Sequence, residues 1–492
     1  MASAGDASPH EHSPGGSRSE TGYSRRRPEL TVLHRVVREN LETFLADARE
    51  RLGSGYPRFV ENEFRRYLDC GLLERGFARV RCESCGHDRL VAFSCKSRGV
   101  CPSCAGRRMS DTAAFLADHV LPIASYRQWT FSVPRWLRPR MVRDGQVLSR
   151  VLGVFLGTVF SWQQRRARAE GLSDPAAGSV TFVQRFGSAL NLHLHFHAVL
   201  PDGVFVHPAG DEAALAFTAL PPPSDLDVTS LTDRLARRLT KLFSDHDERP
   251  LRDEEEALAS SWAESLKQKR RAEGEPDPED AASPGSLCAL IEGFSLHAAT
   301  RVDASDRRGL EHLLRYGARP GFSQKRLALR ADGKVVYRFR KPWHTGQTEL
   351  VMEPVQLLRR LAAILPPPRQ NQIRFHGLFA SRARNRAALA ALLPPRETPA
   401  EPPTAEAPTT GDGARVARPR KLLWASLLRR VFAHDILVCP RCEGPMRLIA
   451  VLTEPKVVAR MLRHLGLPTE PPTTAPARAP PQAELFVEHA SE

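Results

Sequence analysis

The sequence lacks long apolar runs. No stretch of 18 consecutive apolar residues occurs among its 492 residues, so it predicts no transmembrane helix. Residues 1–28 also lack the apolar centre of a secretion signal and consist largely of Ser, Gly, Pro and charged residues. We therefore expect a cytoplasmic protein with no membrane partner. We also expect this N-terminal segment to be disordered, because it has too little apolar surface to offset the chain entropy lost on folding.

Acidic residues are in deficit. The 56 Asp and Glu face 71 Lys and Arg, which gives a formal charge of +15 and a pI of about 9.8. Such a charge favours polyanionic partners and the diffusional capture of nucleic acid. The phosphate-binding pattern G-x-x-x-x-G-K-[ST] is absent, so the sequence contains no sign of a nucleotide cofactor.

The nine cysteines do not resemble a disulfide framework, because most lie in C-x2-C pairs. Fifteen residues separate the pair Cys82 and Cys85 from the pair Cys101 and Cys104. Two such turns can supply four thiolates to one tetrahedral Zn²⁺, so we predict a structural zinc site at these four residues. Cys95 lies between the pairs and could replace one ligand. The nearby basic residues Arg107 and Arg108 indicate contact with nucleic acid.

Three further cysteines have no clear partner. Cys70 lies upstream of the first pair, and Cys439-x2-Cys442 resembles half of a second ribbon with no later cysteine. Another part of the chain could complete this second site, as could either of two histidines, His434 or His464. The role of these cysteines stays open from sequence alone.

Histidines alternate with apolar residues from Asn191 to Leu200. In a strand, His193, His195 and His197 would share one face. Imidazole is the commonest metal ligand in proteins near neutral pH, so we predict a metal site on a sheet.

Tyrosine is scarce, with six in the chain, and Tyr316 lies at the end of an amphipathic helix. Arg315 and Arg319 flank it. A phenol between two guanidinium groups, in a basic protein with a histidine metal site, could attack a metal-polarised phosphodiester. Tyr337 alternates with apolar residues and is predicted to be structural.

Composition also divides the chain. Helical periodicity precedes the first cysteines, and short β-branched or aromatic segments flank the histidines and alternate with helical ones. We predict a helical and zinc-ribbon DNA-binding domain at 29–118, an α+β catalytic domain at 119–393 with a mobile acidic insertion at 245–286, a linker at 394–418, a small C-terminal module with a CxxC at 419–468, and a disordered tail at 469–492.

Four segments together resemble the rolling-circle HUH transposases of bacterial insertion sequences and common-region elements. They are Cys95-Lys-Ser-Arg-Gly-Val-Cys-Pro-Ser-Cys104, the run from Phe186 to His197, Arg315-Tyr-Gly-Ala-Arg-Pro320 and Arg374-Phe-His-Gly377. The resemblance runs in order from about residue 30 to 470. It implies an α+β fold in which an HUH nuclease domain with a central antiparallel sheet follows the zinc-binding domain and precedes the small module.

The resemblance also implies roles for residues. His195 and His197 would hold Mg²⁺ or Mn²⁺ against the scissile phosphate, and Tyr316 would attack it to give a 5′-phosphotyrosine and a free 3′-hydroxyl. Some relatives have a second tyrosine where this chain has His312, which favours a single-tyrosine mechanism. For the third metal ligand we favour Gln184, with His193, Asp202 and His312 as alternatives. The expected DNA-binding residues are Arg107, Arg108, Arg315, Arg319 and Arg374.

The predicted function is therefore a transposase that nicks and rejoins single-stranded DNA at element ends. Its expected partners are the transposon ends, the target strand and host replication proteins at the bacterial nucleoid. A replication initiator or relaxase would use the same chemistry at a plasmid origin. A non-catalytic zinc-containing DNA-binding regulator would tolerate Tyr316→Phe, and a three-histidine metallohydrolase would require neither the tyrosine nor the positive charge.

Overall fold

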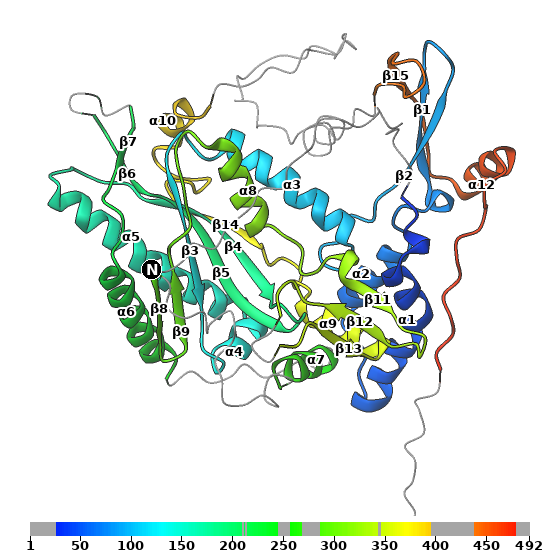
Figure 1. Ribbon diagram of the computed structural model, residues 1–492, viewed down its shortest axis with the longest axis horizontal. Coiled ribbons are helices and arrows are strands. Elements are labelled where there is room, and N and C mark those ends of the chain that lie inside the picture. Colours follow the sequence, from blue (N-terminus) through cyan, green and yellow to red (C-terminus); the bar gives the residue numbers. More distant parts are fainter. Residues whose placement is uncertain are drawn as a thin grey trace, which may run out of the picture. The chain divides into compact units, whose positions relative to one another are not determined.

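The computed structural model of the chain describes residues 26–208, 211, 214–244, 256–267, 286–342, 346–394 and 437–478 (Figure 1). Two units share the chain, and each combines segments that are distant in sequence. Among the described residues, the small unit consists of 26–27, 71–93 and 437–471, and the large unit of 28–70, the described part of 94–394, and 472–478.

A seven-stranded sheet forms the centre of the large unit, and every strand pair in it is antiparallel. Its strands, in spatial order, are β14 (Ile373–Gly377), β4 (Gly178–Phe186), β5 (Leu192–Pro201), β3 (Tyr126–Ser132), β9 (Phe294–His297) and β8 (Cys288–Ile291), while β10 (Arg301–Val302) pairs with the start of β3.

Strand β5 lies inside this sheet and is buried along its whole length. Its apolar residues Leu192, Leu194 and Phe196 belong to the main hydrophobic core together with three helices that cover one face of the sheet. These helices are α4 (Arg138–Arg143), α5 (Gly145–Ala169) and α6 (Asp225–Phe243). The side-chain alternation expected from sequence is therefore present.

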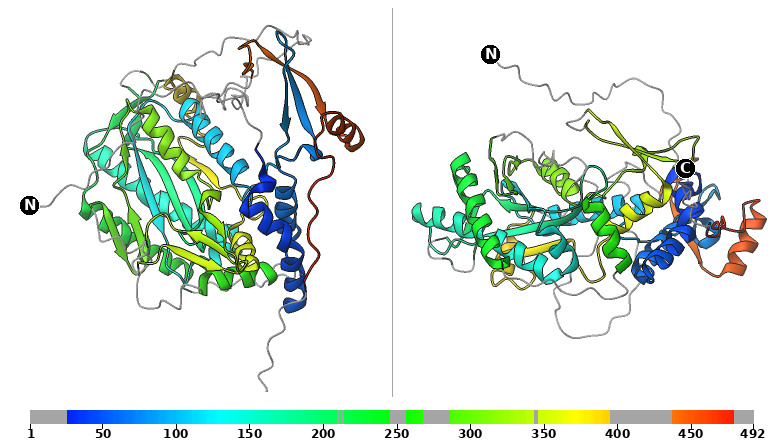
Figure 2. Two further views of the ribbon diagram at one scale, coloured as in Figure 1. Left: turned by 45° about the vertical axis from the view of Figure 1, so that its right-hand side comes forward. Right: turned by 90° about the horizontal axis from the view of Figure 1, so that it is seen from below.

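Two helices cover the other face of the sheet, α3 (Pro102–His119) and α8 (Arg307–Gly317) (Figure 2). They pack on each other and on Val180, Phe182 and Val199 in a second hydrophobic cluster. This second face is the one that the histidines of β5 occupy, because Phe182 pairs directly with His197.

The remaining elements of the large unit lie around this sheet. Helices α1 (Val32–Leu52) and α9 (Pro354–Ile364) contact each other and α7 (Glu256–Lys267). These elements are η1 (Pro28–Leu30), α1 (Val32–Leu52), α2 (Arg58–Leu68), α7 (Glu256–Lys267), α9 (Pro354–Ile364), α10 (Arg386–Ala391) and η5 (Gln324–Arg326), with a β6 (Gly203–Val206) and β7 (Ala216–Ala219) pair and a β11 (Leu327–Leu329), β12 (Val335–Arg338) and β13 (Glu349–Met352) sheet.

Helix α7 corrects the expected mobile insertion at 245–286. Its Trp262 is buried and donates a hydrogen bond to the carbonyl of Ala363 at 3.1 Å. The hydroxyl of Ser265 accepts a hydrogen bond from the backbone N–H of Leu192, the first residue of β5, at 2.7 Å. The acidic composition of this segment therefore did not reveal that one face of its helix is apolar and buried. The other residues of the expected insertion, 245–255 and 268–285, lie outside the described residues.

The expected disorder is also corrected at the C-terminal tail. The backbone N–H of Ala475 donates to the carbonyl of Arg38, and that of Arg478 donates to Thr43, both at 3.0 Å. Residues of the segment 472–478 therefore contact helix α1, while 479–492 lie outside the described residues. The predicted disorder of 1–25 and the predicted linker at 394–418, apart from residue 394, fall outside them as well.

The small unit is a three-stranded antiparallel sheet in the order β15, β1, β2, followed by a helix. Its elements are η2 (Leu73–Arg75), β1 (Phe77–Cys82), β2 (Asp88–Ala92), β15 (Met446–Leu452) and α12 (Pro455–His464). Residues 71–93 thus pair with the C-terminal segment, so neither the domain predicted at 29–118 nor the module at 419–468 is a separate body. Among the helices that the structure describes, none has the length and apolar character needed to cross a membrane.

Candidate functional site

Strand β5 presents three buried histidines, His193, His195 and His197, on one face. Their ring centroids follow one another at 4.8 Å and 4.9 Å. On β4, Gln184 lies directly opposite His195, and on β3, Thr130 lies directly opposite His197. The sheet register therefore surrounds the histidines with polar side chains from both neighbouring strands.

Hydrogen bonds orient two of these imidazoles. The carbonyl of His193 can only accept, so Nδ1 of His195, 3.1 Å away, carries its proton and leaves the lone pair on Nε2. Nδ1 of His197 lies 3.2 Å from the hydroxyl of Thr130, while its Nε2 is buried without a hydrogen-bond partner among the described residues. Burial, with smaller contributions from His195 and Arg319, lowers the pKa of His197 well below its usual value. A neutral imidazole is the form that binds metal.

Tyr316 stands over this face of the sheet, in the last turn of α8. Its ring meets that of His197 edge to face, with centroids 5.5 Å apart. The guanidinium of Arg319 lies 4.3 Å from the centre of the same ring. Tyr316 remains 37% exposed, so it lies at the surface of this face of the large unit. The structure thus brings together His195, His197 and Tyr316, as the sequence predicts.

Gln184 links the tyrosine helix to the histidine strand. Its Nε2 donates to the carbonyl of Tyr316 at 3.1 Å and to that of Gly317 at 2.9 Å, which satisfies the carbonyls at the end of α8. Its Oε1 is buried and has no hydrogen-bond partner in the described part of the chain. Oε1 of Gln184 and Nε2 of His197 are therefore two buried ligand atoms, from paired strands, without a partner.

The other candidates for a third ligand are placed differently. Asp202 lies beyond the far end of β5, where it binds Arg127 at 2.8 Å and Arg301 at 2.9 Å. His312 is exposed, one turn before the tyrosine. His193 shares the face, but within the described residues only cysteine groups bring three or more His, Cys, Asp or Glu ligand atoms within 4.8 Å of one another. A three-histidine cluster is therefore not formed.

Gly317 sets the distance between α8 and the sheet. A Cβ at this position would lie 2.5 Å from the ring of Phe182. We therefore predict that Gly317→Ala costs about 1–3 kcal/mol of unfolding free energy, since the helix must move to relieve the overlap. The same displacement would shift Tyr316 and lower its reactivity. Urea denaturation and a DNA-cleavage assay measure the two effects.

The matched control is Gly153→Ala in α5, where a Cβ has no neighbour within 4 Å. This substitution is expected to leave stability unchanged or to raise it slightly, because Ala is the better helix former. Equal behaviour of the two alanine variants would refute the role assigned to Gly317.

Four of the five predicted DNA-binding arginines lie on the two helices that cover the histidine face or in the residues that follow α8. Arg107 is exposed on α3, and its neighbour Arg108 donates to the carbonyl of Lys96 at 2.9 Å. On α8, Arg315 forms an ion pair with Glu311 at 2.5 Å. Arg319, the fourth, contacts the tyrosine ring as described above.

Arg374 is the exception. It pairs with Thr181 on β4, which in turn pairs with Ala198 on β5, so it lies on the face opposite the histidines. There it donates to the hydroxyl of Ser149 on α5 at 2.8 Å. Arg374, expected to bind DNA, therefore does not share a face with the histidines, because residues one position apart on a strand face opposite layers.

Eight of the nine cysteines form two groups of four, and the predicted set of Cys82, Cys85, Cys101 and Cys104 is divided between them. The reason is the hairpin of β1 and β2. Cys82 and Cys85 lie at its turn, about 17 Å of strand from its base. At the base, the backbone N–H of Gly71 donates to the carbonyl of Phe93 at 2.9 Å, so the residues just outside the hairpin meet instead.

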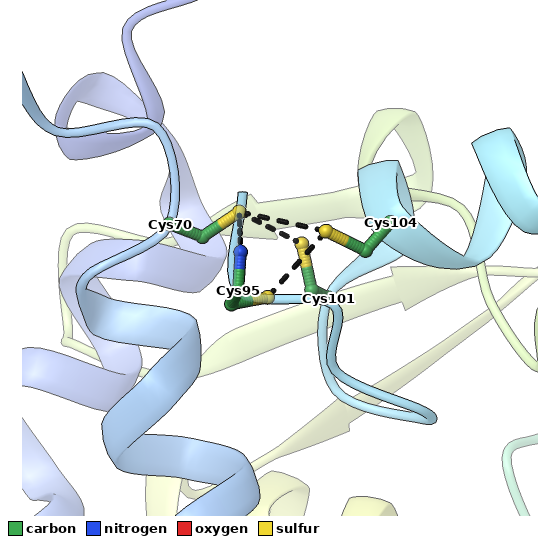
Figure 3. A group of neighbouring side chains, drawn as sticks. All are labelled: Cys70, Cys95, Cys101 and Cys104. Atoms are coloured by element: carbon green, nitrogen blue, oxygen red, sulfur yellow. Dashed lines mark hydrogen bonds between the residues drawn. The ribbon is translucent and has the colours of Figure 1, made fainter. Parts of the chain in front are cut away.

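The first group lies in the large unit and consists of Cys70, Cys95, Cys101 and Cys104 (Figure 3). Cys70 follows α2, Cys95 and Cys101 lie in the connecting loop, and Cys104 lies in the first turn of α3. The sulfur of Cys104 is 3.7 Å from that of Cys70 and 3.5 Å from that of Cys95. Hydrogen bonding from Cys101, followed by Cys70 and Cys95, lowers the pKa of Cys104, so a thiolate is favoured within the group.

The second group lies in the small unit and consists of Cys82, Cys85, Cys439 and Cys442. The sulfurs of Cys82 and Cys442 are 3.4 Å apart, and those of Cys85 and Cys439 are 3.6 Å apart. The backbone N–H of Cys85 contributes most to lowering the pKa of Cys82, to about 6. Of the partners that the sequence left open, the structure brings Cys82 and Cys85 to the C-terminal pair, and His464 is not part of this group; His434 lies outside the described residues.

Both groups fit a tetrahedral zinc. Four sulfurs about 2.3 Å from Zn²⁺ lie about 3.8 Å from one another, close to the separations of the two groups and far beyond the length of a disulfide bond, about 2.05 Å. Counting could have indicated the two sets. Three C-x2-C pairs supply six cysteines, and two four-cysteine sites need eight, so two further cysteines are required. Cys70 and Cys95 are those two.

Comparison with known protein families gives two matches. Residues 178–387, which include β4, β5, α8 and β14, match a family described as "Putative transposase". Residues 37–133, which include the whole first cysteine group, match the "Transposase zinc-binding domain" family. No curated protein and no solved structure matches the chain. The matches support a transposase, a DNA-binding enzyme that cleaves DNA and transfers strands, with zinc in its N-terminal region.

Proposed function

We propose that the protein nicks and rejoins single-stranded DNA at the ends of a mobile element through a covalent bond to Tyr316, as in the rolling-circle HUH transposases that its sequence resembles. The observation that carries this proposal is the edge-to-face contact of Tyr316 with His197, 5.5 Å between ring centroids, on the face where Gln184 and His195 also lie. It sets a phenol beside two potential metal ligands. The transposase match over residues 178–387 covers all of these groups.

In the proposed reaction, the phenolic oxygen of Tyr316 attacks phosphorus and the bond from phosphorus to the 3′ oxygen breaks. A 5′-phosphotyrosine and a strand with a free 3′-hydroxyl result, and the phenol proton is transferred in net terms to the leaving oxygen. Rejoining reverses these steps with a different 3′-hydroxyl. The phosphodiester linkage is conserved throughout, so no nucleotide hydrolysis is required.

His195, His197 and Gln184 are the residues that would hold a divalent ion. The ion would neutralise charge that develops on the phosphate oxygens. Imidazole nitrogens favour a first-row ion such as Mn²⁺ over Mg²⁺, while the amide oxygen suits either. The protein supplies the rest: Thr130 and the carbonyl of His193 orient the rings, and Gln184 connects the ligand set to the tyrosine backbone.

The test of the proposal is a covalent adduct. The protein is incubated with end-labelled single-stranded DNA from the element ends and Mn²⁺ or Mg²⁺, and the products are separated on denaturing gels. A labelled band at the mass of the protein, lost on proteolysis, is expected. A DNA-binding regulator gives no such band, and a hydrolytic metalloenzyme releases free 5′-phosphate ends instead.

We predict that His197→Ala lowers the rate of adduct formation by about 10³-fold, because one ion ligand is lost and phosphate charge is then less well neutralised. His376→Ala is the matched control. His376 is partly buried in β14 of the same sheet, but its partner Ser179 places it on the opposite face. The control should retain cleavage. Adduct formation that resists both His197→Ala and EDTA would contradict the metal assignment.

A further inference from the structure

A cavity lined by four arginines lies beside the tyrosine. The residues that we call the arginine pocket are Arg98, Arg108, Arg185 and Arg319, all of which line it together with Gln184. Residues of α3, β4 and α9 and the segment that follows α8 complete its lining. No Asp or Glu is among the lining residues that the structure describes. The cavity is therefore strongly positive and contains no built-in counter-charge.

Arg185 is the most unusual member of the pocket. Only 2% of it is exposed, and Nε and both Nη atoms have no hydrogen-bond partner in the described part of the chain. Burial lowers the pKa of Arg185 to about 10, so the group still carries its charge at neutral pH. An unpaired buried guanidinium costs several kcal/mol unless an anion joins it. The nitrogens themselves are enclosed, so an anion would approach this charge from the cavity that Arg185 lines.

The fold holds this side chain in place. The pairing of β4 with β5 is irregular between Gln184 and Phe186, so Arg185 lies at the irregularity, next to the residue that supports the tyrosine. Arg319 packs on the ring of Phe186 at 5.5 Å. Arg98 is fixed through the carbonyl of Gln370 at 2.7 Å. The guanidinium groups are thus positioned before any ligand arrives.

The carboxylate of Glu63 is held by groups of the loop that carries Arg98. The carboxylate of Glu63 accepts from the backbone N–H groups of Arg98, at 2.8 Å, and of Gly99, at 3.1 Å, and from the hydroxyl of Ser97. It therefore holds the loop that joins Cys95 to Cys101, and its hydrogen bonds go to this loop and not to a guanidinium group of the arginine pocket. The zinc-binding loop in this way delivers one arginine to the pocket.

We propose that the arginine pocket binds a phosphate group of the DNA strand next to the phosphate that Tyr316 attacks. The choice of DNA rests on the proposed function, whereas the choice of phosphate rests on the pocket itself. Guanidinium groups match phosphate oxygens in planar, paired hydrogen bonds, and apolar walls strengthen these bonds by excluding water. A backbone phosphate bound here would fix the register of the strand at the nucleophile.

The first experiment measures phosphate alone. Thermal unfolding of the full-length protein is followed with and without about 20 mM inorganic phosphate, at ionic strength matched with NaCl. Phosphate is expected to raise the melting temperature of the wild type by a few degrees and that of Arg185→Leu not at all. Without phosphate, Arg185→Leu should melt at or above the wild-type temperature, because the unpaired charge is gone. An equal phosphate response in both proteins would overturn the proposal.

Arg360→Leu is the matched control. Arg360 is also buried, with its pKa likewise lowered by burial to about 10, but it donates to the carbonyl of Ala189 at 3.0 Å and does not line the pocket. This variant should lose stability and keep the full response to phosphate. If Arg185→Leu fails to fold, Arg185→Lys retains the charge without the planar fork and should show a reduced phosphate response.

The second experiment separates this proposal from the chemistry of Tyr316. In a Tyr316→Phe background, which cannot form the adduct, Arg185→Leu is expected to weaken binding of a dT15 oligonucleotide by about 10-fold to 100-fold, as loss of a buried charged contact does. Inorganic phosphate should compete with dT15 in the Tyr316→Phe protein. An unchanged affinity for dT15 would show that the pocket serves a free phosphate and not DNA, and would refute the proposal. Failure of the tyrosine mechanism would leave these binding results as expected.

Discussion

Tyr316→Phe is expected to abolish the covalent adduct while single-stranded DNA binding persists. The substitution removes the hydroxyl and keeps the ring, so the edge-to-face contact with His197 at 5.5 Å and the stacking of Arg319 at 4.3 Å remain. The residue one turn earlier on the helix is His312 and not a second tyrosine, so α8 offers no replacement phenol. Gel separation after incubation with labelled DNA and Mn²⁺ measures the loss.

Tyr337→Phe is the control for this experiment. Tyr337 is fully buried in β12, and its hydroxyl lies 3.4 Å from Arg326. Its loss should lower stability slightly and leave the adduct intact, as its structural position suggests. An undiminished adduct in Tyr316→Phe, with loss of the adduct in Tyr337→Phe, would reassign the nucleophile.

The positions of the site residues within their own strand and helix can be predicted from sequence. A period of two in β5 and the leucine spacing in α8 are enough to place three histidines on one strand face and Tyr316 at a helix end. The meeting of these elements is not encoded locally. It depends on Gly317, whose missing side chain admits the ring of Phe182, and on the two hydrogen bonds from Gln184 to the end of the helix.

The errors have physical causes of the same kind. Arg374 follows the period of its strand, but sequence does not show which phase faces the histidines. The acidic residues around 256 suggested mobility, yet Trp262 and Ser265 anchor that helix to the core. The sequence around Arg185 is typical of an ordinary strand. Only the structure shows that Arg185 is buried and lies at the irregular pairing beside Gln184.

The cysteines illustrate how far spacing alone can mislead. A ribbon spacing between two C-x2-C pairs is usually enough to propose one zinc, but here a hairpin separates the pairs. Cys70 is brought to Cys95 by the closure of the hairpin base, and the partner of the first pair lies more than 350 residues later, at Cys439 and Cys442. A zinc ion at such a non-local site would join the two distant segments of the small unit.

Wild-type protein is therefore expected to contain two tightly held zinc ions per chain, and Cys101→Ser and Cys442→Ser one each. Structural zinc sites contribute about 10–16 kcal/mol of binding energy near neutral pH, so loss of either ion should unfold what depends on it. In Cys101→Ser this is the loop that delivers Arg98 to the arginine pocket and the start of α3, so adduct formation should fall with zinc content.

In Cys442→Ser the loss should be confined to the small unit. The second cysteine group, β1, β2 and β15 all belong to that unit, whereas Tyr316, His197 and Gln184 belong to the other. Adduct formation on a short strand should therefore survive while protection of the small unit from hydrogen exchange is lost. Cys288→Ser, which changes the one cysteine outside both groups, should keep two zinc ions. Elemental analysis of the four proteins checks these values, and an equal zinc content in the wild type and Cys442→Ser would show that the second group is not a metal site.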